Sequence, residues 1–242
     1  MFVLATDFGL SGPYVGQVHA VLASQAPTVP VVNLFADLPA FNPRASAYLL
    51  SACSAGFRQG SIFLCVVDPG VGTERDILLL HTPTGWFIGP DNGLLAVVAK
   101  RSPGDCAVWR LRWRPEHSSA TFHGRDVIAP VAVTLANGQF PLAEAIPLAD
   151  MVGSDWPDDL AEVVYFDHYG NALTGLRADR IGTEARVHIG DRVLERARTF
   201  SDRAPGAPFW YANSNGLVEF AVNQGRAERD LALSIGTTFS VA

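Results

Sequence analysis

Lysine is almost absent from this sequence of 242 residues. Lys100 is the only one, and the rest of the 18 basic residues are arginine. A lysine Schiff base and a phosphate-loop lysine are therefore nearly excluded as functional groups. Charged residues make up only 17% of the chain, and the net charge is −6. Because affinity for nucleic acid comes mainly from basic patches, we expect no nucleic-acid partner.

Cysteine is also scarce, with Cys53, Cys65 and Cys106 widely spaced. An odd number at this spacing predicts neither a disulfide framework nor a zinc site. His123 and Asp126 form only a weak candidate for metal binding, because no third ligand lies at a useful spacing. We therefore predict no metal and no cofactor.

Long hydrophobic runs are missing as well. No segment reaches the roughly 18 apolar residues of a membrane helix, and the N-terminus lacks a basic signal-peptide region. These absences favour a cytoplasmic protein that does not bind membranes. Hydrophobic residues still make up 48% of the chain, which is enough for a sizeable core.

The first part of the chain alternates strand and helix patterns, which indicates an α/β fold. The expected strands are 1–6, 29–35, 62–67 and 77–81, and the expected helices are 14–24, 43–55, 92–100 and 126–137. We therefore predict an N-terminal α/β sheet-and-helix domain over residues 1–148.

The pattern changes after this domain. Residues 149–160 are polar, contain glycine and proline, and predict a linker. Short strands with turn signals then predict a smaller, all-β, barrel-like C-terminal domain over residues 161–242. Its expected strands are 162–167, 172–176, 185–189, 209–213, 217–222 and 231–237.

Two acidic residues follow predicted strands of the first domain. Asp7 ends the first strand, and the carboxyl ends of strands are where open α/β sheets bind ligands. Asp68 ends the run Ile62 to Val67, and two glycines then allow Arg75 to fold back onto it. A charge-assisted pair would keep the Asp68 carboxyl ionised. The plain alternatives are a helix N-cap at Asp7 and a structural ion pair at Asp68.

Three further segments carry polar side chains at turns. His123 precedes the predicted helix at 126 and is either a general base or a capping residue. Asp167 to Asn171 and Asn213 to Gly216 are typical of hairpin turns, although their acid, aromatic and amide groups also suit ligand binding.

Taken together and in order, these motifs resemble one family. It comprises the S-adenosyl-L-methionine (SAM) hydrolases that form adenosine, also called SAM hydroxide adenosyltransferases, which share their fold with fluorinases and chlorinases. The resemblance spans nearly the whole chain. It rests on Thr6-Asp7-Phe8-Gly9, Val66 to Thr73 with Arg75, Pro90-Asp91-Asn92-Gly93, Phe122 to Asp126, Asp167 with Gly170-Asn171, and Asn213-Ser214-Asn215-Gly216.

The resemblance implies hydrolysis of SAM at C5′ of the ribose by water, giving adenosine and L-methionine without a metal. It also implies that Asp68, Arg75 and His123 surround the attacking water. Which of the three takes the proton stays open. The family further implies a homotrimer with active sites at its subunit interfaces, each between the N-terminal domain of one subunit and the β domain of another.

The same resemblance assigns the substrate contacts. Asp7 would bind the ribose hydroxyls, and Phe41 would form an apolar wall beside them. Asp167 would bind the methionine ammonium, Asn171 the adenine edge, and Tyr169 would pack near the adenine. Ser214 and Asn215 would bind the methionine carboxylate. The chain departs from the family by having His168-Tyr169 where Arg-Phe is usual, and a neutral Asn215 where halogenases carry arginine.

Two other functions compete with hydrolysis. A halogenase would use chloride or fluoride on the same substrate, but a carboxylate at Asp68 disfavours an anionic nucleophile. A non-catalytic SAM or adenosine sensor would need the ribose and adenine contacts, but not Asp68, Arg75 and His123 together.

Overall fold

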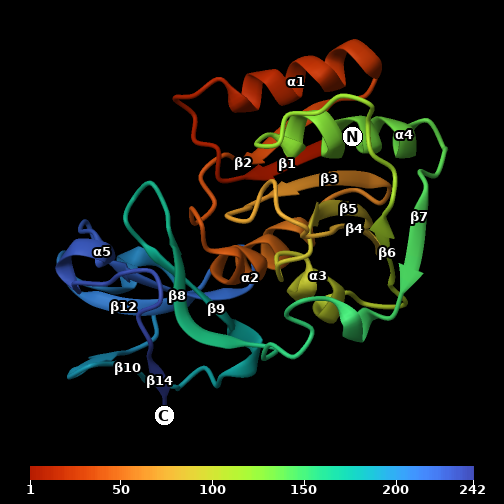
Figure 1. Ribbon diagram of the computed structural model, residues 1–242. Coiled ribbons are helices and arrows are strands. Elements are labelled where there is room, and N and C mark those ends of the chain that lie inside the picture. Colours follow the sequence, from red (N-terminus) through yellow and green to blue (C-terminus); the bar gives the residue numbers. More distant parts are fainter. The chain divides into compact units, whose positions relative to one another are not determined.

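The computed structural model describes residues 1–242 and divides them into two compact units (Figure 1). The N-terminal unit comprises Met1–Ala47 and Ser54–Trp156, and the C-terminal unit comprises Tyr48–Cys53 and Pro157–Ala242. No helix combines the length and the apolar character needed to cross a membrane.

A seven-stranded mixed sheet forms the centre of the N-terminal unit, in the order β2-β1-β3-β5-β4-β6-β7. Strands β2, β1, β3 and β5 are parallel, whereas β4, β6 and β7 extend the sheet in antiparallel fashion. The strands are β1 (Phe2–Thr6), β2 (Val31–Phe35), β3 (Ser61–Val66), β4 (Ile77–His81), β5 (Gly85–Pro90), β6 (Ala107–Leu111) and β7 (Ala143–Ile146).

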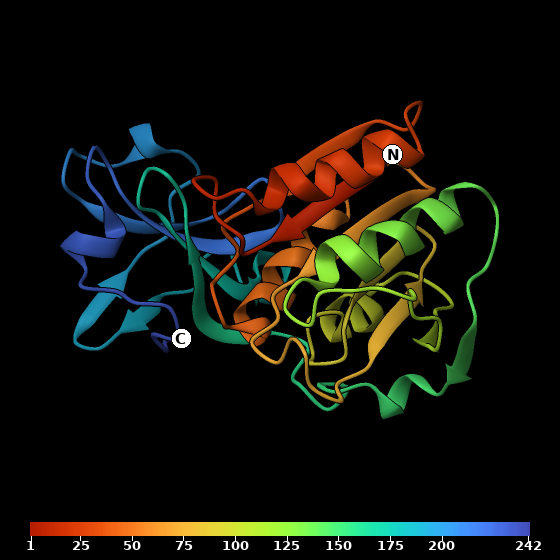
Figure 2. The same ribbon diagram turned by 45° about the horizontal axis from the view of Figure 1, so that its top comes forward.

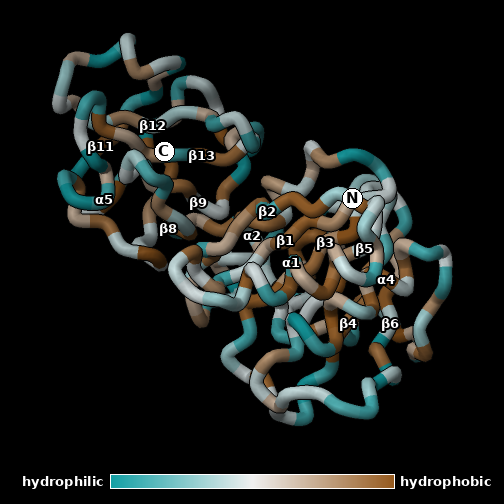
Figure 3. Tube along the Cα trace, turned by 90° about the horizontal axis from the view of Figure 1, so that it is seen from above, coloured by the Kyte–Doolittle hydropathy of each residue, from teal (hydrophilic) through white to brown (hydrophobic).

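Both faces of the central strands are buried, which is why these strands are apolar throughout. Alternate side chains of β1 and β3, such as Phe2 and Leu64, pack against α1 (Tyr14–Gln25) and α4 (Ala129–Ala136). Figures 1 and 2 show these two helices on one face of the sheet, and α3 (Ala96–Arg101) lies on the other. The hydropathy colouring of Figure 3 marks β1, β3 and β5 as the hydrophobic centre of this unit.

The helix α2 (Pro43–Ser54) begins where the sequence predicts it. Proline occupies its first turn, and the side chain of Asn42 accepts a hydrogen bond from the amide of Ala45 at 3.0 Å. Both features satisfy the start of a helix, whose first amides have no partner within the helix.

The C-terminal unit contains two antiparallel sheets, in the orders β12-β13-β9-β8 and β11-β10-β14. Trp210, Phe220 and Phe239 belong to its core. The four-stranded sheet consists of β8 (Leu160–Phe166), β9 (Ala172–Arg177), β12 (Pro208–Ala212) and β13 (Leu217–Val222), and the smaller one of β10 (Val187–Ile189), β11 (Arg192–Leu194) and β14 (Ser240–Val241).

The predicted fold class is confirmed: an α/β unit precedes a unit built of antiparallel strands. The strand expected at 231–237 is wrong. The short helix α5 (Ala227–Asp230) ends there, and the amides of Leu231 and Leu233 donate to carbonyls of the preceding helical turn. Their alternating burial imitates a strand pattern, although the backbone is a helix C-terminus followed by turns.

The strands β5, β6, β7, β11 and β14 were not expected from sequence. None of them shows a strict alternation of buried and exposed side chains. Their pairing with neighbours in the sheet fixes their conformation more than local preference does.

The stacked rings of Phe63 and Phe87 support the sheet core, with centroids 4.3 Å apart. We expect Phe63→Ala to lower the free energy of unfolding by about 3 to 5 kcal/mol, because it empties a fully buried site. Phe140→Ala is the control, since Phe140 is half exposed and its loss should cost about 1 kcal/mol or less. Urea unfolding measures both, and equal losses would contradict this account of the core.

Candidate active site

Asp68 lies immediately beyond the carboxyl end of β3, in the middle of the parallel part of the sheet. The side chain of Asn92 donates to the carbonyl of Val67 at 2.9 Å and so fixes the backbone just before Asp68. The Pro90-Asp91-Asn92-Gly93 motif therefore has a structural task here: it holds the strand end that presents the carboxylate.

The predicted ion pair between Asp68 and Arg75 is confirmed. Nη2 of Arg75 donates to Oδ2 of Asp68, and Nη1 donates to the carbonyl of Asp76 at 2.7 Å. The two side chains are only 7% and 12% exposed. A pair this well buried is screened little by solvent, so the guanidinium is held in one orientation.

Gly72 explains why the loop between the pair needs glycine. Its φ is +84°, and a Cβ atom placed there would lie 2.6 Å from the carbonyl oxygen of Ala120. Any other residue would push this loop away from the segment that leads to His123. The loop after β3 and the loop before His123 are therefore packed together backbone to backbone.

His123 stands directly before η1 (Gly124–Ile128), a single π-helical turn that continues into α4. Such turns are rare within α-helices, and those that occur often lie at functional sites. Gly124 permits close packing, because a Cβ atom there would approach the ring of Phe8 to 3.0 Å. The carboxylate of Asp126 is already engaged by the Arg125 guanidinium at 2.6 Å and by the amide of Ser119 at 2.8 Å.

A small cleft of about 120 Å³ brings four predicted residues together: Asp7, Phe41, Asp68 and His123. Arg75 reaches the same group through its pairing with Asp68. The amide of Phe41 donates to Oδ2 of Asp7 at 3.3 Å, and Phe41 has a φ of +59°, which is unusual for a residue with a side chain. The phenyl ring is 79% exposed at the edge of the cleft.

Six buried side-chain polar atoms in the chain have no hydrogen-bond partner within the protein, and three of them belong to the predicted trio. They are Oδ1 of Asp68, Nε of Arg75 and Nδ1 of His123. Buried polar atoms left unpaired are costly, so their concentration here indicates a place built for a polar group from outside the protein. One water molecule, which both donates and accepts, suits such a set.

Charge and burial shift the pKa values of these groups in a consistent way. Burial raises the pKa of Asp68, and the Arg75 guanidinium opposes this rise. Burial lowers the pKa of His123, and the positive charge of Arg75 lowers it further. Because the ordinary pKa of histidine is 6.5 and that of His123 is lowered, the His123 ring is neutral at pH 7, while the Arg75 guanidinium favours the ionised form of Asp68.

A second cleft, of about 470 Å³, lies in the C-terminal unit and contains Asp167, Tyr169 and Asn171. The carboxylate of Asp167 accepts hydrogen bonds from the backbone amide and from Nδ2 of Asn171, both at 2.9 Å. Tyr211 and Phe200 also line the cleft, whereas no lysine or arginine does. An acidic and aromatic cleft of this kind suits a flat ring and a cationic group.

Ser214 and Asn215 line neither cleft. They occupy an exposed turn that Asn213 organises, because its Oδ1 accepts from the amides of Asn215 and Leu217 at 2.9 Å. The structure therefore does not bring these two residues to the other predicted contacts of the C-terminal unit.

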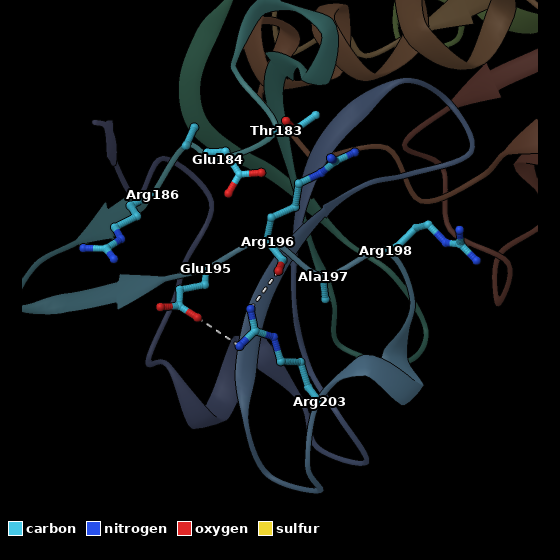
Figure 4. A pocket seen from close by; sticks show the side chains of 9 residues that line it. Thr183, Glu184, Arg186, Glu195, Arg196, Ala197, Arg198 and Arg203 are labelled. Carbon is cyan, nitrogen blue, oxygen red and sulfur yellow. Dashed lines mark hydrogen bonds and ion pairs between the residues drawn. The ribbon is translucent and has the colours of Figure 1, made fainter.

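A third cleft, of about 430 Å³, holds none of the predicted residues (Figure 4). Arg186, Arg196, Arg198 and Arg203 line it, and Arg203 donates to Glu195 at 3.1 Å. Figure 4 shows the Arg186 and Arg198 side chains extending in opposite directions. The arginines do not converge on one point, so the cleft lacks the geometry of an anion site.

Sequence reasoning missed several residues of the two main clefts. Thr121 and Phe122 line the first, and Phe200, Tyr211 and Gln224 line the second. Gln224 has a φ of +56°, which no sequence pattern revealed. For Tyr211 a signal existed, because it pairs with Glu219, an acid inside an otherwise apolar strand.

No group of three or more potential metal ligands gathers anywhere in the chain.

The fold and the first cleft define a class: a two-unit protein whose α/β unit presents a carboxylate, a guanidinium and an imidazole to one small polar site. Two family descriptions match this chain. The SAM hydroxide adenosyltransferase N-terminal domain matches residues 2–145, and the corresponding C-terminal domain matches residues 161–240. The chain belongs to the SAM hydroxide adenosyltransferase family.

Several relatives match nearly the full chain. The (R)-S-adenosyl-L-methionine hydrolase of Salinispora arenicola (strain CNS-205) is 38% identical over 98% of this chain and 95% of its own length. The protein of the same name from Thermus thermophilus is 39% identical over 96% of this chain and 95% of its own. A fluorinase from Nocardia brasiliensis is more distant, at 24% identity over 98% of this chain and 94% of its own.

Solved structures agree with this fold. A protein from Thermotoga maritima superimposes with a TM-score of 0.89 at 29% identity, and the match covers all of both chains. A protein from Thermus thermophilus superimposes with a TM-score of 0.81 at 35% identity, covering all of this chain and 99% of its own.

The coupling between Arg75 and His123 can be measured without any substrate. We expect Arg75→Met to raise the pKa of His123, because it removes a positive charge that opposes protonation of the ring. Titration of the His123 ring followed by NMR gives the value. Arg229→Met is the control, since Arg229 is exposed and does not act on His123. A His123 pKa that stays unchanged in Arg75→Met would contradict the described site.

Proposed function

We propose that this protein hydrolyses S-adenosyl-L-methionine at C5′ of the ribose, producing adenosine and L-methionine. The observation that carries the proposal is the group of unpaired buried atoms on Asp68, Arg75 and His123, in a chain of this family. The names of four relatives specify the (R)-epimer at the sulfonium centre, and we propose the same epimer as substrate here.

The sulfonium of the substrate is already a good leaving group, so the protein does not need to activate one. The oxygen of water forms a bond to C5′ as the bond from C5′ to sulfur breaks. The electron pair of that bond goes to sulfur, which changes from a sulfonium cation to the neutral thioether of methionine. The protein's task is to hold one water in line with the breaking bond and to accept its proton.

The three residues divide this task by their chemistry. Arg75 can only donate, so it orients the water and stabilises negative charge that develops on its oxygen. Oδ1 of Asp68 and Nδ1 of His123 are the two free atoms able to accept the proton. Both pKa shifts favour this, because burial raises the pKa of Asp68, which makes its carboxylate a stronger base, and lowers that of His123, which keeps the ring neutral.

The remaining predicted residues are proposed as substrate contacts. Asp7 would accept hydrogen bonds from the ribose hydroxyls, and the exposed ring of Phe41 would cover the sugar. In the C-terminal cleft, Tyr169 would pack on the adenine, Asn171 would bind its edge and Asp167 would bind the ammonium group. The acidic and aromatic lining of that cleft supports this placement. Ser214 and Asn215 have no comparable structural support.

Halogenation is the closest competing chemistry, since a fluorinase is a distant relative. Asp68 argues against it, because an ionised carboxylate beside the nucleophile repels chloride and fluoride but accepts a proton from water. A sensor without turnover would have no use for unpaired buried atoms on a carboxylate, a guanidinium and an imidazole together.

Labelled water tests the reaction directly. The purified protein is incubated with the (R)-epimer of SAM in water labelled with heavy oxygen, with and without chloride. We expect adenosine that carries the label at its 5′ oxygen, and Asp68→Asn should lower kcat by about a hundredfold or more. Asp179→Asn, at an exposed position, is the control. A 5′-chloro product would indicate a halogenase, and binding without product would indicate a sensor.

We further propose a homotrimer in which each active site combines the N-terminal unit of one copy with the C-terminal unit of another. The proposal is supported by the division of predicted contacts, because the water-binding trio lies in one unit and the acidic, aromatic cleft in the other. The cytoplasmic location stays a prediction from sequence.

Mixed subunits test the shared site. Asp68→Asn and Asp167→Ala each disable a different unit, and each alone should be inactive. If each site combines units from two copies, some sites of a mixed trimer contain an intact N-terminal unit and an intact C-terminal unit. Random mixing leaves about a quarter of the sites intact, so co-expression should restore about a quarter of the wild-type activity. A mixture as inactive as its parents would show that each copy builds its site alone.

A further inference from the structure

The turn after β5, residues 90–93, does more than fix the end of β3. The backbone amide of Asp91 donates to the carbonyl of Asp76 at 2.9 Å. The same carbonyl accepts the hydrogen bond from Nη1 of Arg75 at 2.7 Å. One carbonyl oxygen therefore joins the turn to the guanidinium and limits where the guanidinium can lie.

Neighbouring residues of this turn thus hold the two halves of the ion pair. Asn92 donates to the carbonyl immediately before Asp68, and Asp91 donates to the carbonyl that also receives Arg75. Because a planar peptide links the two residues, the separation of these contacts is set by one rigid stretch of backbone. The turn therefore sets where the guanidinium lies relative to the carboxylate.

The segment 152–156 holds the turn itself. Oδ1 of Asp91 accepts a hydrogen bond from the amide of Val152 at 2.9 Å, 61 residues further along the chain. The indole ring of Trp156 packs directly on Gly93, where a Cβ atom would lie 2.2 Å from Cη2 of the ring. These contacts restrict the movement of the turn, so it can serve as a fixed support.

We propose that Asn92 is a positioning residue for the hydrolysis: it keeps the Asp68 carboxylate where Arg75 pairs with it and where its free oxygen meets the attacking water. This inference rests on the proposed function. Asn92 does not line the first cleft, so it acts only through the backbone before Asp68. Displacements of about 1 Å in such supports lower reaction rates strongly, because the reacting atoms must stay in line.

The first test is Asn92→Ala, which removes the donor to the Val67 carbonyl and changes no charge. We expect kcat with the (R)-epimer of SAM to fall at least about tenfold, because a displaced carboxylate no longer holds the water in line. KM should change by less than about twofold, since no proposed substrate contact is altered.

The pH dependence of kcat separates positioning from a loss of folded protein. The titratable groups that face Asp68 are Asp7, Arg75 and His123, and Arg75 lowers the pKa of Asp68. A looser pair therefore gives Asp68 a higher pKa. Because the proposed hydrolysis uses the ionised carboxylate, the acid limb of the profile should move to higher pH in Asn92→Ala. A smaller folded fraction would scale the whole profile without moving this limb.

Thr82→Val is the matched control. Thr82 is 2% exposed at the opposite end of β5, where its Oγ1 donates to the carbonyl of Gly85 at 3.2 Å. The variant also removes a buried side-chain hydrogen bond to the backbone of the same sheet, but away from the ion pair. We expect it to keep the wild-type kcat and the wild-type acid limb.

Asp91 keeps the test decisive if Asn92→Ala does not fold. Asp91→Ala removes the acceptor for the amide of Val152, whereas Asp91→Asn keeps an oxygen at that place. We expect Asp91→Ala to lower kcat at least about tenfold and Asp91→Asn to restore it to within about threefold of the wild type. Equal losses in both variants would attribute the effect to charge and overturn the positioning account.

The outcomes separate the two proposals. A wild type without turnover would refute the proposed function, and this inference with it. An active wild type whose kcat and acid limb are unchanged in Asn92→Ala would refute the inference alone. A lower kcat with an unmoved acid limb would show that Asn92 serves only folding, which also overturns the inference.

Discussion

The ion pair between Asp68 and Arg75 is the interaction on which the rest of the catalytic unit depends. Burial favours the protonated form of the carboxylate, because it raises the pKa of Asp68. The guanidinium opposes this effect and leaves one oxygen of the carboxylate free. The glycine loop after β3 exists to make this return possible, and Gly72 fits only because it has no side chain. The need to keep the Asp68 carboxylate charged thus explains its pairing with Arg75 and the glycine loop between the two residues.

Both units contain carboxylates held by neighbouring groups, but these carboxylates serve a different purpose in each unit. In the N-terminal unit the carboxylate keeps a free oxygen, which suits proton transfer. In the C-terminal unit the carboxylates of Asp167 and Glu219 each accept hydrogen bonds from neighbouring side chains, which holds those side chains in fixed positions. The first arrangement is reactive, and the second is rigid. A hydrolase that must place one water against one carbon needs both.

Membership of the SAM hydroxide adenosyltransferase family explains why the site needs few reactive groups. The sulfonium substrate brings its own positive charge and its own leaving group, so the protein supplies position and a proton acceptor. The net negative charge of the chain and the absence of basic residues from the second cleft agree with a cationic ligand. The arginines that do occur are mostly committed to ion pairs or extend from the surface.

The sequence by itself determined the fold class, the return of Arg75 to Asp68 and the positions of the acidic strand ends. These features follow from local rules: hydrophobic period, glycine freedom and the chemistry of strand ends. It did not determine β5, β6 and β7, whose conformation depends on pairing with neighbours far along the chain. Only the tertiary structure revealed the π-turn after His123, the absence of Ser214 and Asn215 from the second cleft, and the donors that meet at Glu219. The π-turn packs closely against Phe8, a residue distant in sequence, and a local pattern carries no information about such contacts.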